Sequence, residues 1–117
     1  MITVRPADAI RINKRFNRTK VSWVDRNLLG SAFSSFSYYD TDIEKICSIF
    51  RGLVKNHAFS DGNKRTASAI LVSWLEQNGY SLLQEDLCDL VMDVATHSYG
   101  VSEIVALLKS ELIRNVV

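Results

Sequence analysis

The sequence predicts an all-α protein, a compact bundle of about six helices that forms a single domain over residues 1–117. Apolar residues recur every three or four positions along most of the chain, which is typical of amphipathic helices. No series of segments shows the alternation of apolar and polar residues that indicates β-strands. With 117 residues, 47% of them hydrophobic, and one proline, the chain has the size and composition of one domain with its own core.

The first part of the chain predicts two helices and a loop. A first helix is expected over residues 7–18, because Pro6 suits the first turn of a helix. A second, short helix is expected over about 25–33, with Asp25 near its start. The Ser-rich and aromatic stretch 34–39 is predicted to be a loop or a short extended flap.

The clearest helices lie in the middle of the chain. Thr41 and Glu44 have the spacing of a capping box, in which a hydroxyl caps the helix start and an acid reaches back. This helix should run to about Asn56, and another should run from near Asn63 to Asn78. The second helix has a wide apolar stripe, so we expect it to be central. The stripe contains Ala67, Ala69, Ile70, Leu71, Val72, Trp74 and Leu75.

The last part of the chain predicts two more helices, over residues 86–97 and 102–114, from apolar residues at helical spacing. Cys47 and Cys88 lie far apart and form no C-x-x-C pair. Both stand among apolar residues, so we expect buried, reduced thiols.

Charge and hydropathy exclude several classes of protein. The net charge is +1, from 14 Lys and Arg against 13 Asp and Glu, which does not favour direct binding of nucleic acid. No apolar run approaches the ~20 residues that span a membrane. The first residues lack the apolar segment of a secretory signal. These features predict a cytoplasmic protein without a membrane partner.

One polar segment, HAFSDGNKRT, begins at His57 and departs from the helical pattern. A turn at Asp61 and Gly62 precedes a helix whose first N–H groups and dipole favour an anion. Lys64 and Arg65 add positive charge where it opposes that dipole, and such a conflict suggests a functional site. The expected ligand is a phosphate chain, with Asp61 as an oxygen ligand for the accompanying Mg²⁺. His57 is then a candidate base beside the phosphates.

Other interpretations of this segment are less favoured. His57 and Asp61 have the i, i+4 spacing of two metal ligands, but Gly62 interrupts the helix and no third ligand is evident. A P-loop requires G-x-x-x-x-G-K-[ST] after a strand, whereas here Asn63 stands at the lysine position and a helix precedes. A polar corner between two helices, with Lys64 and Arg65 in solvent, is the purely structural alternative.

The same residues resemble the signature of the Fic/Doc family, and most closely that of its Doc branch. The general Fic pattern is H-P-F-x-x-G-N-G-R-x-x-R, and the Doc pattern is H-x-F-x-D-[GA]-N-K-R. The segment HAFSDGNKR is similar to the second pattern at each defined position. Similarity extends to residues 25–33 and 74–80, and covers about 25–112 in all. The resemblance implies a helical bundle around the helix that carries the motif.

The resemblance also implies a role for each motif residue. His57 matches the general base that takes the proton from a target hydroxyl, and Phe59 matches the core anchor that fixes the loop. Asp61 matches the Mg²⁺ ligand. The positions that bind nucleotide phosphates are matched by Gly62, Asn63, Lys64 and Arg65.

Two positions separate the reactions known in this family. Adenylyl-transferring members carry Gly at the position of Lys64 and a second Arg at the position of Ser68. The Doc form implies a kinase that uses ATP and Mg²⁺ and transfers the γ-phosphate to a protein hydroxyl. The implied target class is elongation factor Tu, whose phosphorylation would arrest translation. Phosphoryl transfer needs mainly positioning and positive charge, which this segment supplies. One alternative is an enzyme that transfers an adenylyl or other nucleotidyl group. The other is a non-catalytic module that binds nucleotide or antitoxin.

Further features are compatible with more than one role. Lys55 stands where Doc proteins often carry Arg, and either helps to bind phosphate or is a solvated residue at the helix end. Phe36, Tyr38 and Tyr39 match the family's flap position. The resemblance implies an antitoxin whose tail folds on binding. Five basic residues fit either an acidic partner or a solvated helix face: Arg11, Lys14, Arg15, Arg18 and Lys20.

Overall fold

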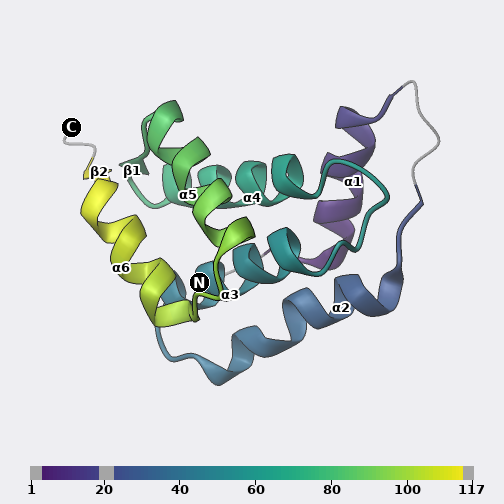
Figure 1. The fold of residues 1–117 in the computed structure, drawn as a ribbon, viewed down its shortest axis with the longest axis horizontal. Coiled ribbons are helices and arrows are strands. Elements are labelled where there is room, and N and C mark those ends of the chain that lie inside the picture. The colour runs from purple at the N-terminus through teal and green to yellow at the C-terminus, as the bar shows by residue number, and fades with distance from the viewer. Residues whose placement is uncertain (1–3, 19–22, 115–117) are drawn as a thin grey trace.

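The computed structural model describes residues 4–18 and 23–114, and within them it contains six α-helices (Figure 1). The predicted all-α class and number of helices are confirmed. The helices are α1 (Pro6–Phe16), α2 (Arg26–Ser34), α3 (Asp42–Lys55), α4 (Asn63–Gln77), α5 (Gln84–Thr96) and α6 (Val101–Glu111).

The predicted helix starts are confirmed by their capping contacts. Pro6 is the first residue of α1, where its missing N–H costs no hydrogen bond. Asp25 caps α2, and its carboxylate accepts hydrogen bonds from the second and third N–H groups of that helix. At α3, Thr41 Oγ1 accepts from the N–H of Glu44 at 3.3 Å, and Glu44 Oε1 accepts from the N–H of Thr41 at 3.2 Å.

Three segments differ from the sequence prediction. Helix α1 ends at Phe16 rather than at residue 18, and Asn17 is its C-terminal cap. The stretch predicted as a loop or flap instead contains a 3₁₀ helix, η1 (Ser35–Tyr38), whose Ser35 hydroxyl forms a hydrogen bond with Ser48 of α3 at 2.7 Å. The last helix ends at Glu111 rather than at residue 114, because β2 (Ile113–Arg114) pairs antiparallel with β1 (Tyr80–Ser81). Local periodicity cannot indicate two-residue strands, since they depend on a partner distant in the chain.

The core lies mainly between α3 and α4. Helix α3 packs against α2, α4, α5 and α6. Gly52 of α3 lies so close to α2 that a Cβ atom there would be 2.6 Å from the Cα atom of Ala32. Because α3 and α4 are both packed in the core, the two ends of the loop that joins them are held in place. The nearly inaccessible side chains include Ile46, Ile49, Phe50, Leu53, Ile70, Leu71, Leu75, Ile104 and Leu108.

The two cysteines have different environments. Cys47 is buried in the core, as predicted, and burial raises the pKa of its thiol to about 12. Cys88 is exposed, so the prediction of a second buried thiol is wrong. It occupies a solvent-facing position on α5 between the buried residues Leu87 and Leu90.

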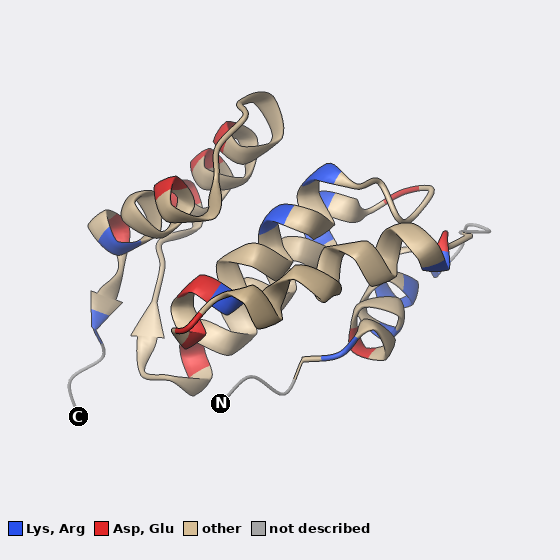
Figure 2. Ribbon diagram, turned by 90° about the horizontal axis from the view of Figure 1, so that it is seen from below, with Lys and Arg blue, Asp and Glu red and all other residues tan. Residues whose placement is uncertain are grey.

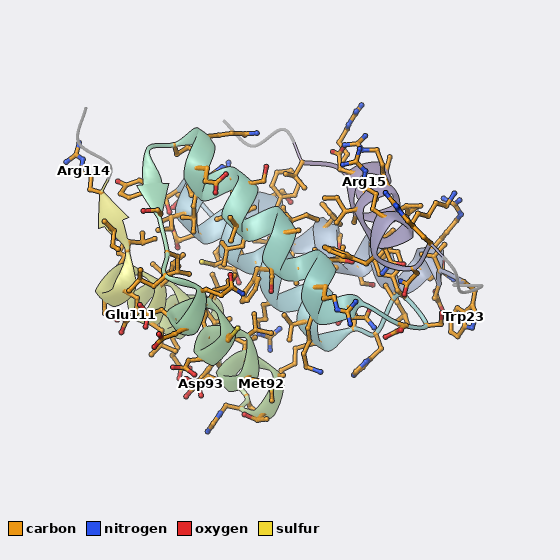
Figure 3. All side chains as sticks on the ribbon, turned by 90° about the horizontal axis from the view of Figure 1, so that it is seen from above. Arg15, Trp23, Met92, Asp93, Glu111 and Arg114 are labelled. Atoms are coloured by element: carbon orange, nitrogen blue, oxygen red, sulfur yellow. The ribbon has the colours of Figure 1, made fainter. Side chains whose placement is uncertain are left out.

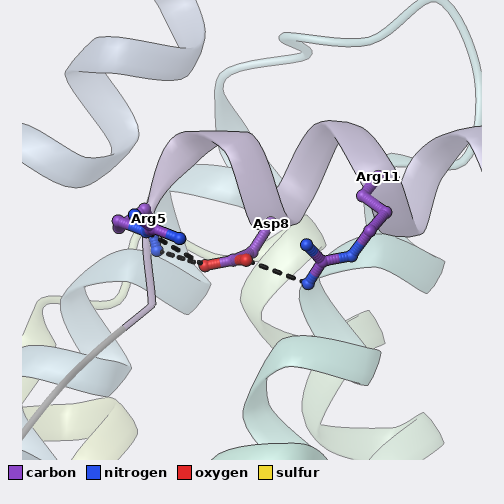
Figure 4. Close-up of polar contacts among 3 residues, drawn as sticks. All are labelled: Arg5, Asp8 and Arg11. Atoms are coloured by element: carbon purple, nitrogen blue, oxygen red, sulfur yellow. Dashed lines mark hydrogen bonds and ion pairs between the residues drawn. The ribbon is translucent and has the colours of Figure 1, made fainter.

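The charges are distributed unevenly over the bundle. Acidic residues concentrate on α5 and α6, whereas α1 carries several basic residues (Figure 2). Asp8 accepts a hydrogen bond from the backbone N–H of Arg5 and another from the Arg11 guanidinium, both at 2.9 Å, and these contacts lower the pKa of its carboxyl (Figure 4). The predicted basic residue Lys20 lies outside the described residues. Among the described residues, no helix has the length and apolar character required to cross a bilayer.

Candidate active site

The polar motif forms a loop, residues 56–62, that joins the end of α3 to the start of α4; we call it the motif loop. Two of its residues have a left-handed backbone: Gly62 with φ +80° and His57 with φ +52°. Positive φ is uncommon outside glycine, although His adopts it more readily than most residues. Backbone strain of this kind concentrates at functional sites. The imidazole of His57 is thereby placed at the surface, while the next two residues are buried.

The side chain of Asn63 holds the motif loop through two hydrogen bonds to its backbone. The side chain of Asn63 accepts a hydrogen bond from the N–H of Phe59 at 3.0 Å, and donates to the carbonyl of Phe59 at 2.9 Å. The Phe59 ring is 4% exposed and packs in the core. The Asn63 side chain, which the resemblance places in the anion-binding turn, is therefore engaged with the loop backbone. Its own N–H lies in the first turn of α4.

An extended segment before α2 lies along the outer edge of the motif loop. The N–H of Asp25 donates to the carbonyl of Ala58 at 2.7 Å, and the N–H of Ser60 donates to the carbonyl of Trp23 at 3.1 Å. An isolated antiparallel bridge joins the same two segments. Trp23 is 62% exposed and marks this end of the molecule, opposite Arg114 (Figure 3).

The assignment of the flap to Phe36, Tyr38 and Tyr39 is wrong. These residues precede α3, whereas the motif loop follows it. A helix of 14 residues separates its ends by roughly 20 Å. The segment at residues 23–25 forms hydrogen bonds with the motif loop instead. Of these three residues, Tyr39 packs against the core, whereas the side chain of Tyr38 is exposed.

A shallow pocket of about 250 Å³ lies at the start of α4. Gly62 precedes the helix, and among the described residues no side chain caps the first N–H groups of α4. Lys64 and Arg65 are exposed. The N–H of Gly62 donates to its neighbour Asp61 Oδ1 at 2.8 Å. Val54 and Ser60 line part of the pocket. The rest of its lining consists of six predicted site residues, which the structure therefore brings together: His57, Asp61, Gly62, Asn63, Lys64 and Arg65.

Lys55 is the predicted site residue that the structure does not bring into this pocket. Its ammonium group donates a hydrogen bond to the backbone carbonyl of His97, between α5 and α6, at 2.7 Å. Arg51, one turn earlier on α3, similarly donates from Nε to the carbonyl of Tyr99 at 2.7 Å. Both basic side chains thus connect α3 to the segment between α5 and α6. A role of Lys55 in phosphate binding stays a prediction.

Two buried asparagines on or next to α1 also contact the motif loop, and no sequence motif indicated them. Asn13 and Asn17 are 2% and 7% exposed. Asn13 Nδ2 donates to the carbonyl of Asp61 at 2.8 Å, and Asn17 Nδ2 lies 3.3 Å from the same oxygen. With Ala9, these residues form an i, i+4, i+8 face directed toward the core. Asparagine at the core-facing positions of an amphipathic helix is seldom buried without a hydrogen-bond partner. The helical spacing of Asn13 and Asn17 could therefore have indicated a buried polar contact.

The pocket fits a nucleotide phosphate with Mg²⁺. At its helix start no side chain of the described residues caps the first N–H groups, and two cationic side chains stand beside them. Mg²⁺ usually keeps several waters and binds through one or two carboxylates plus the substrate phosphates. The exposed carboxylate of Asp61 therefore suffices for the protein's share of the ligands.

The fold is thus an all-α bundle in which an exposed histidine and the first residues of α4 line one pocket. The family model described as Fic/DOC family matches residues 11–75, more than half of the chain, and the chain belongs to this family. Its members are typically transferases. The match extends from α1 through most of α4 and includes the whole motif loop. A search of curated proteins found no match.

Proposed function

We propose that this protein is a Doc-like toxin of a toxin–antitoxin module, an ATP-dependent kinase that phosphorylates a hydroxyl of a translation factor and arrests translation. The observation that carries the proposal is Lys64, which takes the place of the Gly found in adenylyl-transferring members. It is the second residue of α4, exposed, and lines the same pocket as His57. The expected target class is elongation factor Tu.

The transfer is a displacement at the γ-phosphorus of ATP. The target hydroxyl oxygen forms a bond to that phosphorus, the bond to the β–γ bridging oxygen breaks, and ADP leaves. His57 accepts the proton of the hydroxyl, since its exposed imidazole lines the pocket. Lys64, Arg65 and the N–H groups of α4 stabilise the negative charge on the phosphoryl oxygens. Mg²⁺, held by Asp61, would supply further charge neutralisation on the phosphates.

Adenylyl transfer is the second candidate, because the motif retains the H-x-F-x-x-G-N core shared with Fic proteins. Two side chains argue against it. Lys64 occupies space beside the helix start, and Ser68 lacks the cationic group that the second Arg would provide. The Ser68 hydroxyl instead donates to the carbonyl of Lys64 at 2.8 Å, within its own helix.

The proposed function also implies a protein that restrains the toxin. We expect an antitoxin whose tail folds on this chain, as the Doc resemblance implies. Four exposed basic residues of the α1 region remain candidates for contact with an acidic partner: Arg11, which also pairs with Asp8, and Lys14, Arg15 and Arg18.

The proposal is tested with γ-labelled ATP, Mg²⁺ and a bacterial lysate. The wild-type protein should label one protein band. His57→Ala should abolish the label while its thermal unfolding and its ATP binding stay unchanged. Equal labelling by His57→Ala would exclude His57 as the base. Absence of any labelled band with γ- or α-labelled ATP would favour a non-catalytic module that binds nucleotide or antitoxin.

A further inference from the structure

The peptide unit between Asp61 and Gly62 lies between the pocket and α1. Its carbonyl oxygen faces α1 and accepts a hydrogen bond from Asn13 Nδ2 at 2.8 Å. Asn17 Nδ2 lies 3.3 Å from the same oxygen, and also donates to Asn13 Oδ1 at 3.2 Å. The hydrogen bond from Asn17 Nδ2 to Asn13 Oδ1 fixes the orientation of the Asn13 amide. Its oxygen faces Asn17, so its nitrogen faces the motif loop.

The direction of this carbonyl determines the direction of the next N–H. A trans peptide is planar, and its C=O and N–H point in opposite directions. Because the carbonyl of Asp61 points to α1, the N–H of Gly62 points away from α1. This N–H donates to Asp61 Oδ1, a carboxylate that lines the pocket. The Gly62 N–H therefore lies on the pocket side of the peptide, next to the first turn of α4.

The packing around Gly62 shows how closely α1 approaches. A Cβ atom at this position would lie 3.0 Å from Asn13 Nδ2 and 3.1 Å from Asn17 Nδ2. Asn13 Nδ2 also lies 3.2 Å from Thr66 Oγ1, at the first turn of α4. One buried amide therefore connects α1 to both the motif loop and the motif helix. The Fic signature contains none of these α1 residues.

We propose that Asn13 is a positioning residue, which holds the Asp61–Gly62 peptide with its N–H toward the pocket and so pre-orients the phosphate-binding turn. Asn17 supports it by fixing the amide. The inference rests on the proposed function for its kinetic consequence, but not for its structural one. In the proposed role, Asn13 contacts neither ATP nor the target and acts through Asp61 and Gly62.

The kinetic test compares Asn13→Asp with the same substitution at an exposed asparagine. Asn13→Asp is isosteric and replaces the donor to the Asp61 carbonyl by an oxygen. Asn78→Asp makes the same change at the other end of α4, where Asn78 Nδ2 donates to the carbonyl of Trp74 at 2.8 Å. Misplacement of a transfer site by about 1 Å costs about 100-fold. Asn13→Asp should lower kcat for γ-phosphate transfer by about 10- to 100-fold with KM for ATP little changed, because Lys64 and Arg65 remain. Asn78→Asp should retain wild-type kcat.

A second variant and a second measurement keep the inference testable if Asn13→Asp fails to fold. Asn17→Ala leaves the direct 2.8 Å bond from Asn13 in place and should lower kcat less. In the ATP-free protein, the amide exchange rate of Gly62 should rise about fivefold to tenfold in Asn17→Ala, since about one hydrogen bond's free energy is lost. It should stay unchanged in Asn78→Asp. This exchange measurement requires no transfer activity, so it decides the inference even if the proposed kinase function fails.

Two results would overturn the inference. The first is an equal reduction of kcat in the folded Asn13→Asp and Asn78→Asp variants, which would indicate a general loss of stability. The second is an unchanged exchange rate at Gly62 when Asn17 or Asn13 is substituted.

Discussion

Replacement of glycine by alanine should change the free energy of unfolding in opposite directions at two positions on adjacent helices, Gly52 and Gly30. Gly52 lies inside α3 against α2, whereas Gly30 lies on the exposed side of α2, where a Cβ atom would have no neighbour within 4 Å. Replacing Gly by Ala in a helix interior stabilises it by up to about 1 kcal/mol, because the unfolded chain loses freedom. Gly30→Ala should therefore raise the free energy of unfolding by about that amount.

At Gly52 the steric cost exceeds this gain. A Cβ atom would lie 2.6 Å from the Cα atom and 2.8 Å from the Cβ atom of Ala32, whereas carbon atoms in contact are about 3.5–4.0 Å apart. Helix α2 must then retreat by roughly 1 Å, and overpacking of this kind costs about 1–3 kcal/mol. Because backbone atoms of Ala32 are in the way, we take about 3 kcal/mol, which leaves a net loss of about 2 kcal/mol after the gain in helix propensity.

Thermal unfolding followed by circular dichroism measures both changes. For a domain of this size, 1 kcal/mol corresponds to about 4 °C in Tm. Gly52→Ala should lower Tm by about 8 °C and Gly30→Ala should raise it by about 4 °C. An increase of Tm in Gly52→Ala would refute the close approach of α2 and α3. Because the segment before α2 pairs with the motif loop, Gly52→Ala should also lower transfer activity.

Three further results are expected. Asn63→Ala should lower the free energy of unfolding by about 1–3 kcal/mol, because two hydrogen bonds to the motif loop are lost; urea titration measures it, and an unchanged midpoint would contradict the contact. A thiol reagent should modify Cys88 in the folded protein and Cys47 only after unfolding, since Cys47 is buried and the pKa of its thiol is raised; two fast-reacting thiols would contradict this. Hydrogen bonds from Thr41 hold the pKa of Glu44 below its usual value, so its contribution to stability is present above that value and is lost as the pH falls through the folded pKa. The loss of stability between about pH 7 and about pH 3 should be smaller in Glu44→Gln than in the wild type, and an equal loss would contradict the cap.

Local patterns predicted the parts of the fold that depend on local chemistry. The capping residues Asp25 and Thr41 act on N–H groups two or three residues away, so their helix starts were predictable. The apolar stripe of α4 predicted its buried residues, such as Leu71 and Leu75, for the same reason. The strand pairing of Tyr80 with Arg114 depends on the packing of α6 and could not be inferred from periodicity.

The candidate site shows the same division. The motif residues follow one another along the chain, so their assembly around one pocket was predictable. Asn13 and the segment from Trp23 to Asp25 are remote in sequence and meet the motif loop only through tertiary packing. The double hydrogen bond between Asn63 and Phe59 was also missed, because a side-chain amide at a helix start favours interpretation as a ligand group.

We propose that Lys64 directs the reaction to the terminal phosphate of ATP. The most direct test incubates the protein with Mg²⁺ and a bacterial lysate in two parallel reactions, one with α-labelled and one with γ-labelled ATP. His57→Ala serves as the control in both. We expect a protein band that is labelled only from the γ-phosphate and is absent in the control. A band labelled from the α-phosphate would contradict it and would identify the protein as a nucleotidyltransferase despite Lys64.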